Sequence, residues 1–148
     1  MKKRIPLFAK IGLLMMSALF MLSACTEDKY YENPVDWDIA FPTVNSTEWQ
    51  WIWDASTNTG YYKATKQMNQ LTESLVIDGG IIVARDFGGD LFRPLPYTIY
   101  DIYPDGADTF SQTVDYEYEP GYIHFYCTYS DLYDGRPESM TFKVTSFY

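Results

Sequence analysis

The sequence predicts an all-β domain, an antiparallel β-sandwich of seven or eight short strands, with a small closed β-barrel as the alternative. Two observations favour this fold class. Apolar residues recur with a period near two, and turn-forming residues recur about every ten positions. A hydrophobic share of 47%, with 18% aromatic residues, indicates a folded rather than a disordered chain. The length of 148 residues allows one compact domain, and we expect a signal-peptide helix and a tether to precede it.

Residues 1–24 have the pattern of a secretory signal peptide. Four basic residues lie within the first ten positions, and an uncharged apolar run occupies residues 11–22. Twelve residues rise only about 18 Å as a helix, too short for a bilayer core of about 30 Å. The order basic, apolar, small is that of a signal peptide rather than a membrane span. The alternative, a buried helix, is disfavoured because the run is not amphipathic.

The small residues that end this segment, Leu22-Ser23-Ala24-Cys25, resemble the bacterial lipobox. The resemblance implies cleavage before Cys25 and attachment of a diacylglycerol to its thiol, a better nucleophile than a serine hydroxyl. In enterobacterial lipoproteins an aspartate at the next position marks inner-membrane retention, and this chain has Thr26 there. The following Glu27-Asp28 is similar to the acidic export signals of Bacteroidota surface lipoproteins. We therefore expect lipid anchoring in the outer membrane, facing either the periplasm or the cell surface.

Charge excludes one class of partner. Removing residues 1–24 takes away four of the 11 basic residues and none of the 20 acidic ones, which leaves a net charge of −13. Such a chain repels anionic polymers, so a nucleic-acid partner is not expected. The cysteine count is equally restrictive. If Cys25 carries the lipid, Cys127 has no partner for a disulfide within the chain.

Residues 25–44 are predicted to be the lipidated tether, and residues 45–148 the all-β domain. The tether segment is acidic and contains two prolines, without regular apolar periodicity. Tyr30, Tyr31 and Trp37 are unusual in a spacer. We favour packing of part of the segment along the domain; the alternative is aromatic contact with the membrane interface.

The expected strands follow in order along the chain. They are residues 48–54, 60–65, 81–86, 91–93, 97–103, 110–118, 122–130 and 140–147. Residues 71–77 are ambiguous between a short strand and a turn of helix that starts near Thr72. Pro94 and Pro96 remove backbone donors, so we expect an edge strand or a crossing between sheets at that point.

One hairpin allows its register to be predicted. Pro120-Gly121 fits the centre of a type II turn, so a two-residue loop pairs Glu119 with Tyr122. The pairing separates an apolar face from a polar one, whereas a three-residue loop mixes them. The apolar face comprises Val114, Tyr116, Tyr118, Ile123, Phe125 and Cys127, and buries the unpaired cysteine. The polar face comprises Asp115, Glu117, Glu119, Tyr122, His124 and Tyr126.

Three segments beyond the lipobox carry a wider resemblance. They are DGGIIVARD (78–86), LPYT (95–98) and TFKVTSF (141–147). With them, most of residues 45–148 resembles the small all-β surface lipoproteins of gut Bacteroidota. The resemblance implies an all-β fold and a lipid anchor, and it transfers no catalytic residue. We expect no cofactor.

The candidate ligand-binding residues are those that the hairpin register places on one face: Tyr122, Tyr126, His124, Asp115 and Glu117. Aromatic rings stack on sugars and carboxylates accept hydrogen bonds from hydroxyl groups, so this mixture suits a neutral glycan. The common alternative is a solvated sheet face. Asp115, Glu117 and Glu119 lie at alternate positions, about 6.5–7 Å apart along a strand, which does not exclude the carboxylate pair of a glycosidase. His124 opposite Glu117 would suit a general base. A surface contact is the commoner outcome for that pair.

Two further groups of residues each have a structural and a functional interpretation. Trp49, Trp51 and Trp53 share one strand face, which is either a platform for sugar rings or, more commonly, part of the core. Aspartates in or beside turns can bind Ca²⁺, but they are common in turns for their own hydrogen bonds, so no metal site is predicted. These aspartates are Asp101, Asp105, Asp108, Asp131 and Asp134.

The expected function is non-enzymatic: a binding or accessory role of an outer-membrane lipoprotein. Its expected partners are the membrane, through the lipid on Cys25, and a glycan or another surface protein. The first alternative is a barrel that carries a small ligand, and the second is a carbohydrate hydrolase. An exposed aromatic patch would favour the binding role, and an internal cavity would favour the ligand-carrying barrel. A cleft that contains Glu117 and another carboxylate would favour the hydrolase.

Overall fold

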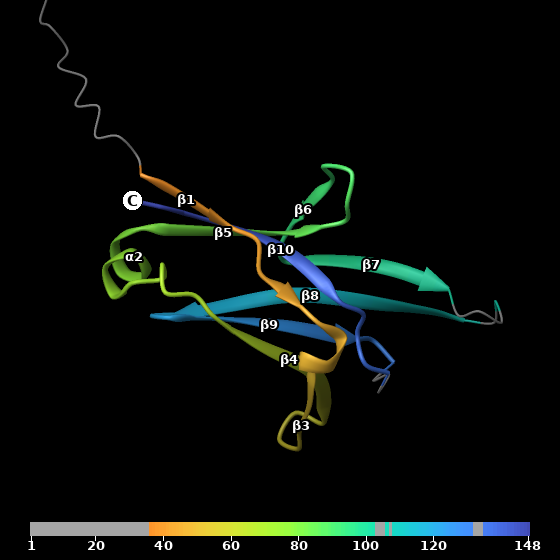
Figure 1. Ribbon diagram of the computed structural model, residues 1–148. Coiled ribbons are helices and arrows are strands. Elements are labelled where there is room, and N and C mark those ends of the chain that lie inside the picture. Colours follow the sequence, from red (N-terminus) through yellow and green to blue (C-terminus); the bar gives the residue numbers. More distant parts are fainter. Residues whose placement is uncertain (1–35, 103–105, 107, 132–134) are drawn as a thin grey trace, which may run out of the picture. The chain divides into compact units, whose positions relative to one another are not determined.

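The computed structural model describes residues 36–102, 106, 108–131 and 135–148. Within the compact unit Pro34–Tyr148, these residues form two antiparallel five-stranded sheets, named sheet A and sheet B (Figure 1). The predicted sandwich is confirmed, with ten strands rather than seven or eight, and the described strands do not close into a barrel. The predicted signal peptide, Cys25, Tyr30 and Tyr31 lie outside the described residues.

Sheet A has the order β1-β10-β5-β6. These strands are β1 (Trp37–Ala40), β10 (Met140–Phe147), β5 (Gly80–Asp86) and β6 (Phe92–Pro94). β2 (Thr43–Val44) pairs with the first residues of β10, beside β1. β1 and β2 belong to the segment predicted to be tether, so part of that segment does pack on the domain. Sheet A therefore begins at Trp37, before the predicted domain boundary at residue 45. The sequence did not predict these strands because strands of two to four residues show too little alternation of apolar and polar positions.

Sheet B has the order β3-β4-β9-β8-β7. Its strands are β3 (Gln50–Asp54), β4 (Thr59–Gln67), β9 (Tyr122–Tyr129), β8 (Thr109–Glu119) and β7 (Tyr97–Ile102). β6 is an edge strand of sheet A and β7 an edge strand of sheet B. The chain thus passes from one sheet to the other at Leu95-Pro96, as the two closely spaced prolines predict.

Two short helices complete the fold of the described residues. The ambiguous segment 71–77 is largely helical: α2 (Glu73–Asp78) begins after Thr72, whose hydroxyl accepts a hydrogen bond from the backbone N–H of Leu75 at 3.3 Å. The 3₁₀ helix η2 (Ser46–Glu48) starts with a capping box. No helix in the described part of the chain is long and apolar enough to cross a bilayer.

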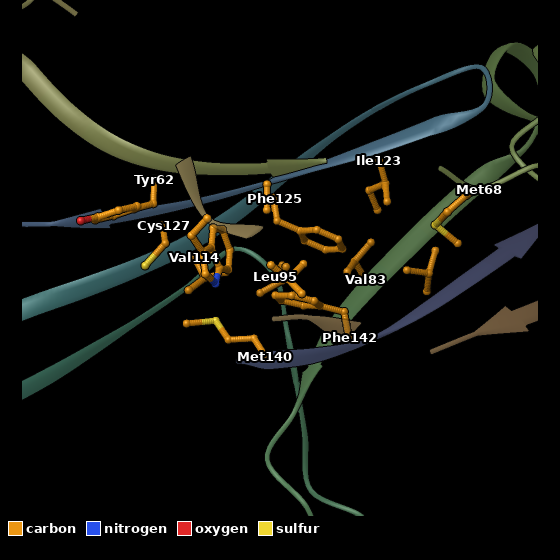
Figure 2. Packing of buried hydrophobic residues seen from close by; sticks show 14 of the residues in the cluster. Tyr62, Met68, Val83, Leu95, Val114, Ile123, Phe125, Cys127, Met140 and Phe142 are labelled. Atoms are coloured by element: carbon orange, nitrogen blue, oxygen red, sulfur yellow. The ribbon is translucent and has the colours of Figure 1, made fainter. Parts of the chain in front are cut away.

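The hydrophobic core lies between the two sheets. Phe125 of sheet B stacks on Phe142 of sheet A, with ring centroids 3.9 Å apart and an interplanar angle of 13° (Figure 2). Val83, Val114 and Ile123 are also fully buried in the same cluster. The inner faces of both sheets alternate with outward-facing residues along each strand, so one core stabilises the whole unit.

The β8–β9 hairpin has the predicted register. Glu119 pairs with Tyr122 and Val114 pairs with Cys127. Gly121 has φ +84°, the left-handed conformation that the third position of a type II turn requires. Cys127 is fully buried and unpaired, as predicted, and burial raises the pKa of its thiol to about 12. The exception on the predicted apolar face is Tyr118, which is exposed near the hairpin tip.

Candidate functional site

The outer face of sheet B gathers all five residues that the sequence predicts to bind a ligand. Cross-strand pairing sets Asp115 opposite Tyr126, Glu117 opposite His124 and Glu119 opposite Tyr122. β4 continues the same face, because Lys63 pairs with Tyr126 and Thr65 pairs with His124. We call this surface the acidic face. Its members are Asp54, Tyr61, Lys63, Thr65, Asp115, Glu117, Glu119, Tyr122, His124 and Tyr126.

Tyr126 lies at the centre of the acidic face and has contacts on three sides. Its phenol donates a hydrogen bond to Glu117 Oε2 at 2.7 Å. Its ring centroid lies 5.8 Å from that of Tyr61 and 5.4 Å from Lys63 Nζ. Partial burial, followed by the hydrogen bond to the Glu117 carboxylate, raises the pKa of Tyr126 well above its ordinary value. The phenol therefore stays protonated and holds the Glu117 carboxylate in place.

His124 has a different carboxylate partner from the one expected. It lies opposite Glu117 in the register, but its Nε2 is 3.1 Å from Glu119 Oε1. Its Nδ1 is 2.8 Å from Thr65 Oγ1, so both ring nitrogens have polar partners on this face. The proposed general-base pair of His124 with Glu117 is not formed. The reason is the reach of glutamate, which lets the residue two positions further along the strand contact the imidazole.

A second aromatic surface lies on the β3–β4 hairpin. Of the two alternatives for the three tryptophans, burial in the core applies to Trp49, whereas Trp51 and Trp53 are not buried. These two are 38% and 47% exposed. They do lie on the inner side of sheet B, because Trp51 pairs with the buried Tyr62. β3 is an edge strand, however, and their exposure shows that sheet A does not cover this end of it.

The indoles of Trp51 and Trp53, which we call the tryptophan surface, lie close to the backbone of Gly60. A Cβ added at Gly60 would be 2.2 Å from the Trp51 ring and 3.1 Å from that of Trp53. The Trp51 ring also packs on Tyr62, with centroids 4.9 Å apart. Glycine at this position thus allows the two indoles to lie close to the hairpin backbone.

One buried charged residue was not anticipated from the sequence. Arg85 of β5 faces inward, hydrogen-bonds the Tyr97 hydroxyl and forms an ion pair with Glu138. Its guanidinium also lies 4.5 Å from the Phe87 ring centroid. These contacts join the segment before β10 to sheet A and provide partners for the two terminal nitrogens of the guanidinium. Among the described residues its buried Nε has no hydrogen-bond partner. The available signal was an arginine within the otherwise apolar run 81–86.

A pocket of about 160 Å³ lies where α2 meets β1 and the end of β10. Its lining includes Asp36, Asp38, Gln70 and Ser146. Sites for drug-sized ligands usually measure about 300–1,000 Å³, so this pocket suits a much smaller occupant. It contains none of the residues predicted to bind a ligand.

The described residues contain no group of three or more histidine, cysteine or acidic side chains placed to hold a metal ion. Asp101, Asp108 and Asp131 are exposed, while Asp105 and Asp134 lie outside the described part of the chain. Comparison of the chain with protein-family models, curated proteins and solved structures finds no match.

Proposed function

We propose that this protein is an outer-membrane lipoprotein, anchored through a lipid on Cys25, whose domain binds a neutral glycan without catalysing a reaction. The anchor is supported by the signal-peptide pattern of residues 1–24 and by the lipobox-like residues 22–25. Two or three acyl chains, each buried CH₂ contributing about 0.8 kcal/mol, would hold the protein firmly.

The observation that carries the binding proposal is the composition of the acidic face. Tyr122 is 43% exposed, and Tyr61 and Tyr126 lie ring to ring beside Asp115 and Glu117. Such rings offer stacking surfaces, and the carboxylates accept hydrogen bonds from sugar hydroxyls. A neutral ligand is favoured because carboxylates on the face repel an anionic one.

Binding is favoured over catalysis by the contacts of the polar groups. Glu117 accepts a hydrogen bond from the Tyr126 hydroxyl, whereas His124 contacts Glu119. His124 and Glu117 therefore do not form the general-base pair that catalysis would need. Glycoside hydrolysis also needs two carboxylates facing across the scissile bond, whereas Asp115 and Glu117 project side by side from one strand. The carrier alternative is less favoured because buried side chains of both sheets pack into one hydrophobic cluster between them.

The anchor is tested by Cys25→Ser. The variant should remain uncleaved by the lipoprotein signal peptidase and should incorporate no labelled palmitate, because the hydroxyl is a poor acceptor of the diacylglyceryl group. Palmitate incorporation equal to that of the wild-type protein would contradict the proposal.

The binding surface is tested by a glycan array with three proteins. These are the wild-type protein, Tyr122→Ala/Tyr126→Ala and Trp51→Ala/Trp53→Ala. We expect the tyrosine variant to lose binding at least tenfold, and the tryptophan variant to retain it. The reverse result would move the site to the tryptophan surface. Failure of the wild-type protein to bind any glycan would contradict the glycan proposal.

A further inference from the structure

The outer face of sheet A is apolar. Trp37 and Ile39 of β1 pair with Phe147 and Thr145 of β10, and so share the side opposite the core. Trp37 is 60% exposed and Ile82 of β5 is 52% exposed. We call this surface the apolar face. Its large members are Trp37, Ile39, Phe41, Ile82, Phe92 and Phe147.

The apolar face is continuous across the strands of sheet A. At one end the Trp37 and Phe147 ring centroids are 5.6 Å apart, and the Phe147 ring covers Gly80 so closely that a Cβ there would lie 2.3 Å from it. At the other end the Phe41 and Phe92 centroids are 6.3 Å apart, with Lys143 Nζ 5.2 Å from the Phe92 centroid. Contiguous exposed apolar surface of this kind marks an interaction site.

Charge is distributed unequally between the two outer faces. On the strands of sheet A, the outward positions carry only Lys143 and Asp86 as charged residues. The acidic face carries four carboxylates, which belong to Asp54, Asp115, Glu117 and Glu119. The apolar face is therefore the part of the outer surface that meets least repulsion from anionic groups, despite the chain's net negative charge.

The position of β1 identifies the occupant. β1 lies at the edge of sheet A where the described chain begins (Figure 1). Trp37 lies twelve positions after Cys25, which limits the distance between these two residues to about 42 Å. A lipid on Cys25 thus keeps a bilayer within reach of this face at all times, whereas a second copy is met only by diffusion.

We propose that the apolar face lies on the membrane interface when Cys25 is anchored, with phospholipid headgroups and upper acyl chains as its partner. This inference rests on the lipid anchor of the proposed function. Tryptophan and phenylalanine partition into this zone, and Lys143 extends its ammonium group towards the phosphates beside the Phe92 ring. The acidic face, on the opposite side of the sandwich, then points away from the membrane and is free to bind a ligand.

The test uses tryptophan fluorescence of the lipidated protein in vesicles. The vesicles contain phosphatidylethanolamine and phosphatidylglycerol, with or without brominated acyl chains that quench nearby indoles. We expect the wild-type protein to be quenched and Trp37→Phe to lose at least half of that quenching. Trp53→Phe, which removes a similarly exposed indole on sheet B, is the matched control and should retain it. Ile82→Asp should also reduce the quenching at least twofold, because it places a carboxylate in the contact.

The outcomes separate this inference from the anchor. A lipidated wild-type protein without quenching overturns the inference and leaves the anchor intact; a concentration-dependent dimer in that case assigns the face to a second copy. Quenching that survives Trp37→Phe and is lost in Trp53→Phe also overturns it, because the tryptophan surface would then be the contact. A protein that incorporates no palmitate fails the anchor proposal itself and this inference with it.

Discussion

The outer faces of the two sheets differ although the sheets are built alike. Each sheet has five antiparallel strands and directs alternate residues into one shared core. Outward positions of sheet B hold mainly tyrosines, carboxylates and hydroxyl groups, with one exposed isoleucine, Ile102, at the end of β7. Those of sheet A hold exposed tryptophan, isoleucine and phenylalanine. An antiparallel sheet usually has one apolar and one solvated face. Sheet B follows this rule, and sheet A does not.

The difference shows that apolar residues buried in the core and apolar residues exposed on an outer face need separate explanations in such a sandwich. Burial in the core explains Val83 and Val144 of sheet A, but not the exposed Ile82 between Ile81 and Val83 on the same strand. Apolar side chains without a covering element carry no folding benefit from burial. The membrane contact proposed above would account for their presence.

The largest expected effect comes from placing the same charge on the two faces of β5. Val83→Asp puts a carboxylate into the core, which costs several kcal/mol, and should abolish the cooperative unfolding transition. Ile82→Asp, one residue earlier, should change the free energy of unfolding by less than about 1 kcal/mol. Urea unfolding followed by circular dichroism measures both. Equal losses in the two variants would mean that the faces of β5 are not as described.

The second effect concerns the contact that joins the sheets. Phe125→Ala removes the ring stacked on Phe142 and should lower the free energy of unfolding by about 3–5 kcal/mol. Tyr100→Ala, on the exposed outer side of β7, should lower it by less than about 0.5 kcal/mol. Thermal unfolding of the two variants and the wild-type protein gives the comparison. A loss below about 1 kcal/mol for Phe125→Ala would contradict the packing in Figure 2.

The third effect is a pH dependence of stability that follows from the burial of Cys127 on the inner face of sheet B. Burial raises the pKa of Cys127 to about 12 from an ordinary value of 9.0. In the unfolded chain the thiol ionises above pH 9, so its contribution to stability is complete below pH 9 and is lost as the pH rises towards 12. The wild-type protein should therefore lose stability over this range faster than Cys127→Ala. Parallel pH profiles, or rapid thiol labelling of the native protein at pH 8, would contradict the burial of Cys127.

The smallest effect is confined to the acidic face. Glu117→Gln removes the carboxylate that accepts the Tyr126 hydrogen bond, so the pKa of Tyr126 should fall towards its ordinary value. The free energy of unfolding should change by less than about 1 kcal/mol, since the pair is close to solvent. Tyrosine titration by nuclear magnetic resonance measures the pKa. Glu119→Gln is the control, because Glu119 has only a minor influence on that phenol. Equal shifts in both variants would argue against a specific Glu117 contact.

Sequence patterns predicted the pairing of neighbouring strands well. They predicted poorly which residues a distant part of the chain covers or pairs with. The β8–β9 register followed from Pro120-Gly121 and from the alternation of apolar and polar residues, because turn geometry and burial both fix it. The crossing at Leu95-Pro96 followed from the loss of backbone donors. The strands β1 and β2 were missed because they are short and are stabilised by pairing with β10, about a hundred residues further along the chain.

The candidate site was predicted in position but not in detail. Period-two alternation places Trp51 and Trp53 on the inner side of their sheet, but it contains no information on whether a second sheet extends over them. The same alternation places His124 opposite Glu117, but it does not show that the Glu119 side chain reaches the imidazole instead. Both depend on three-dimensional neighbours that strand spacing does not encode.

The strand order of sheet A also determines when this sheet can form during folding. β10, the last of the described strands, is inserted between β5 and the pair β1 and β2. Until residues 140–147 are available, β1 and β2 have no partner in the sheet and β5 has only β6, whereas the β3–β4 and β8–β9 hairpins of sheet B can form locally. Such long-range closure slows folding. A chain shortened by its final eight or nine residues would retain its hairpins and lose the central strand around which sheet A is assembled.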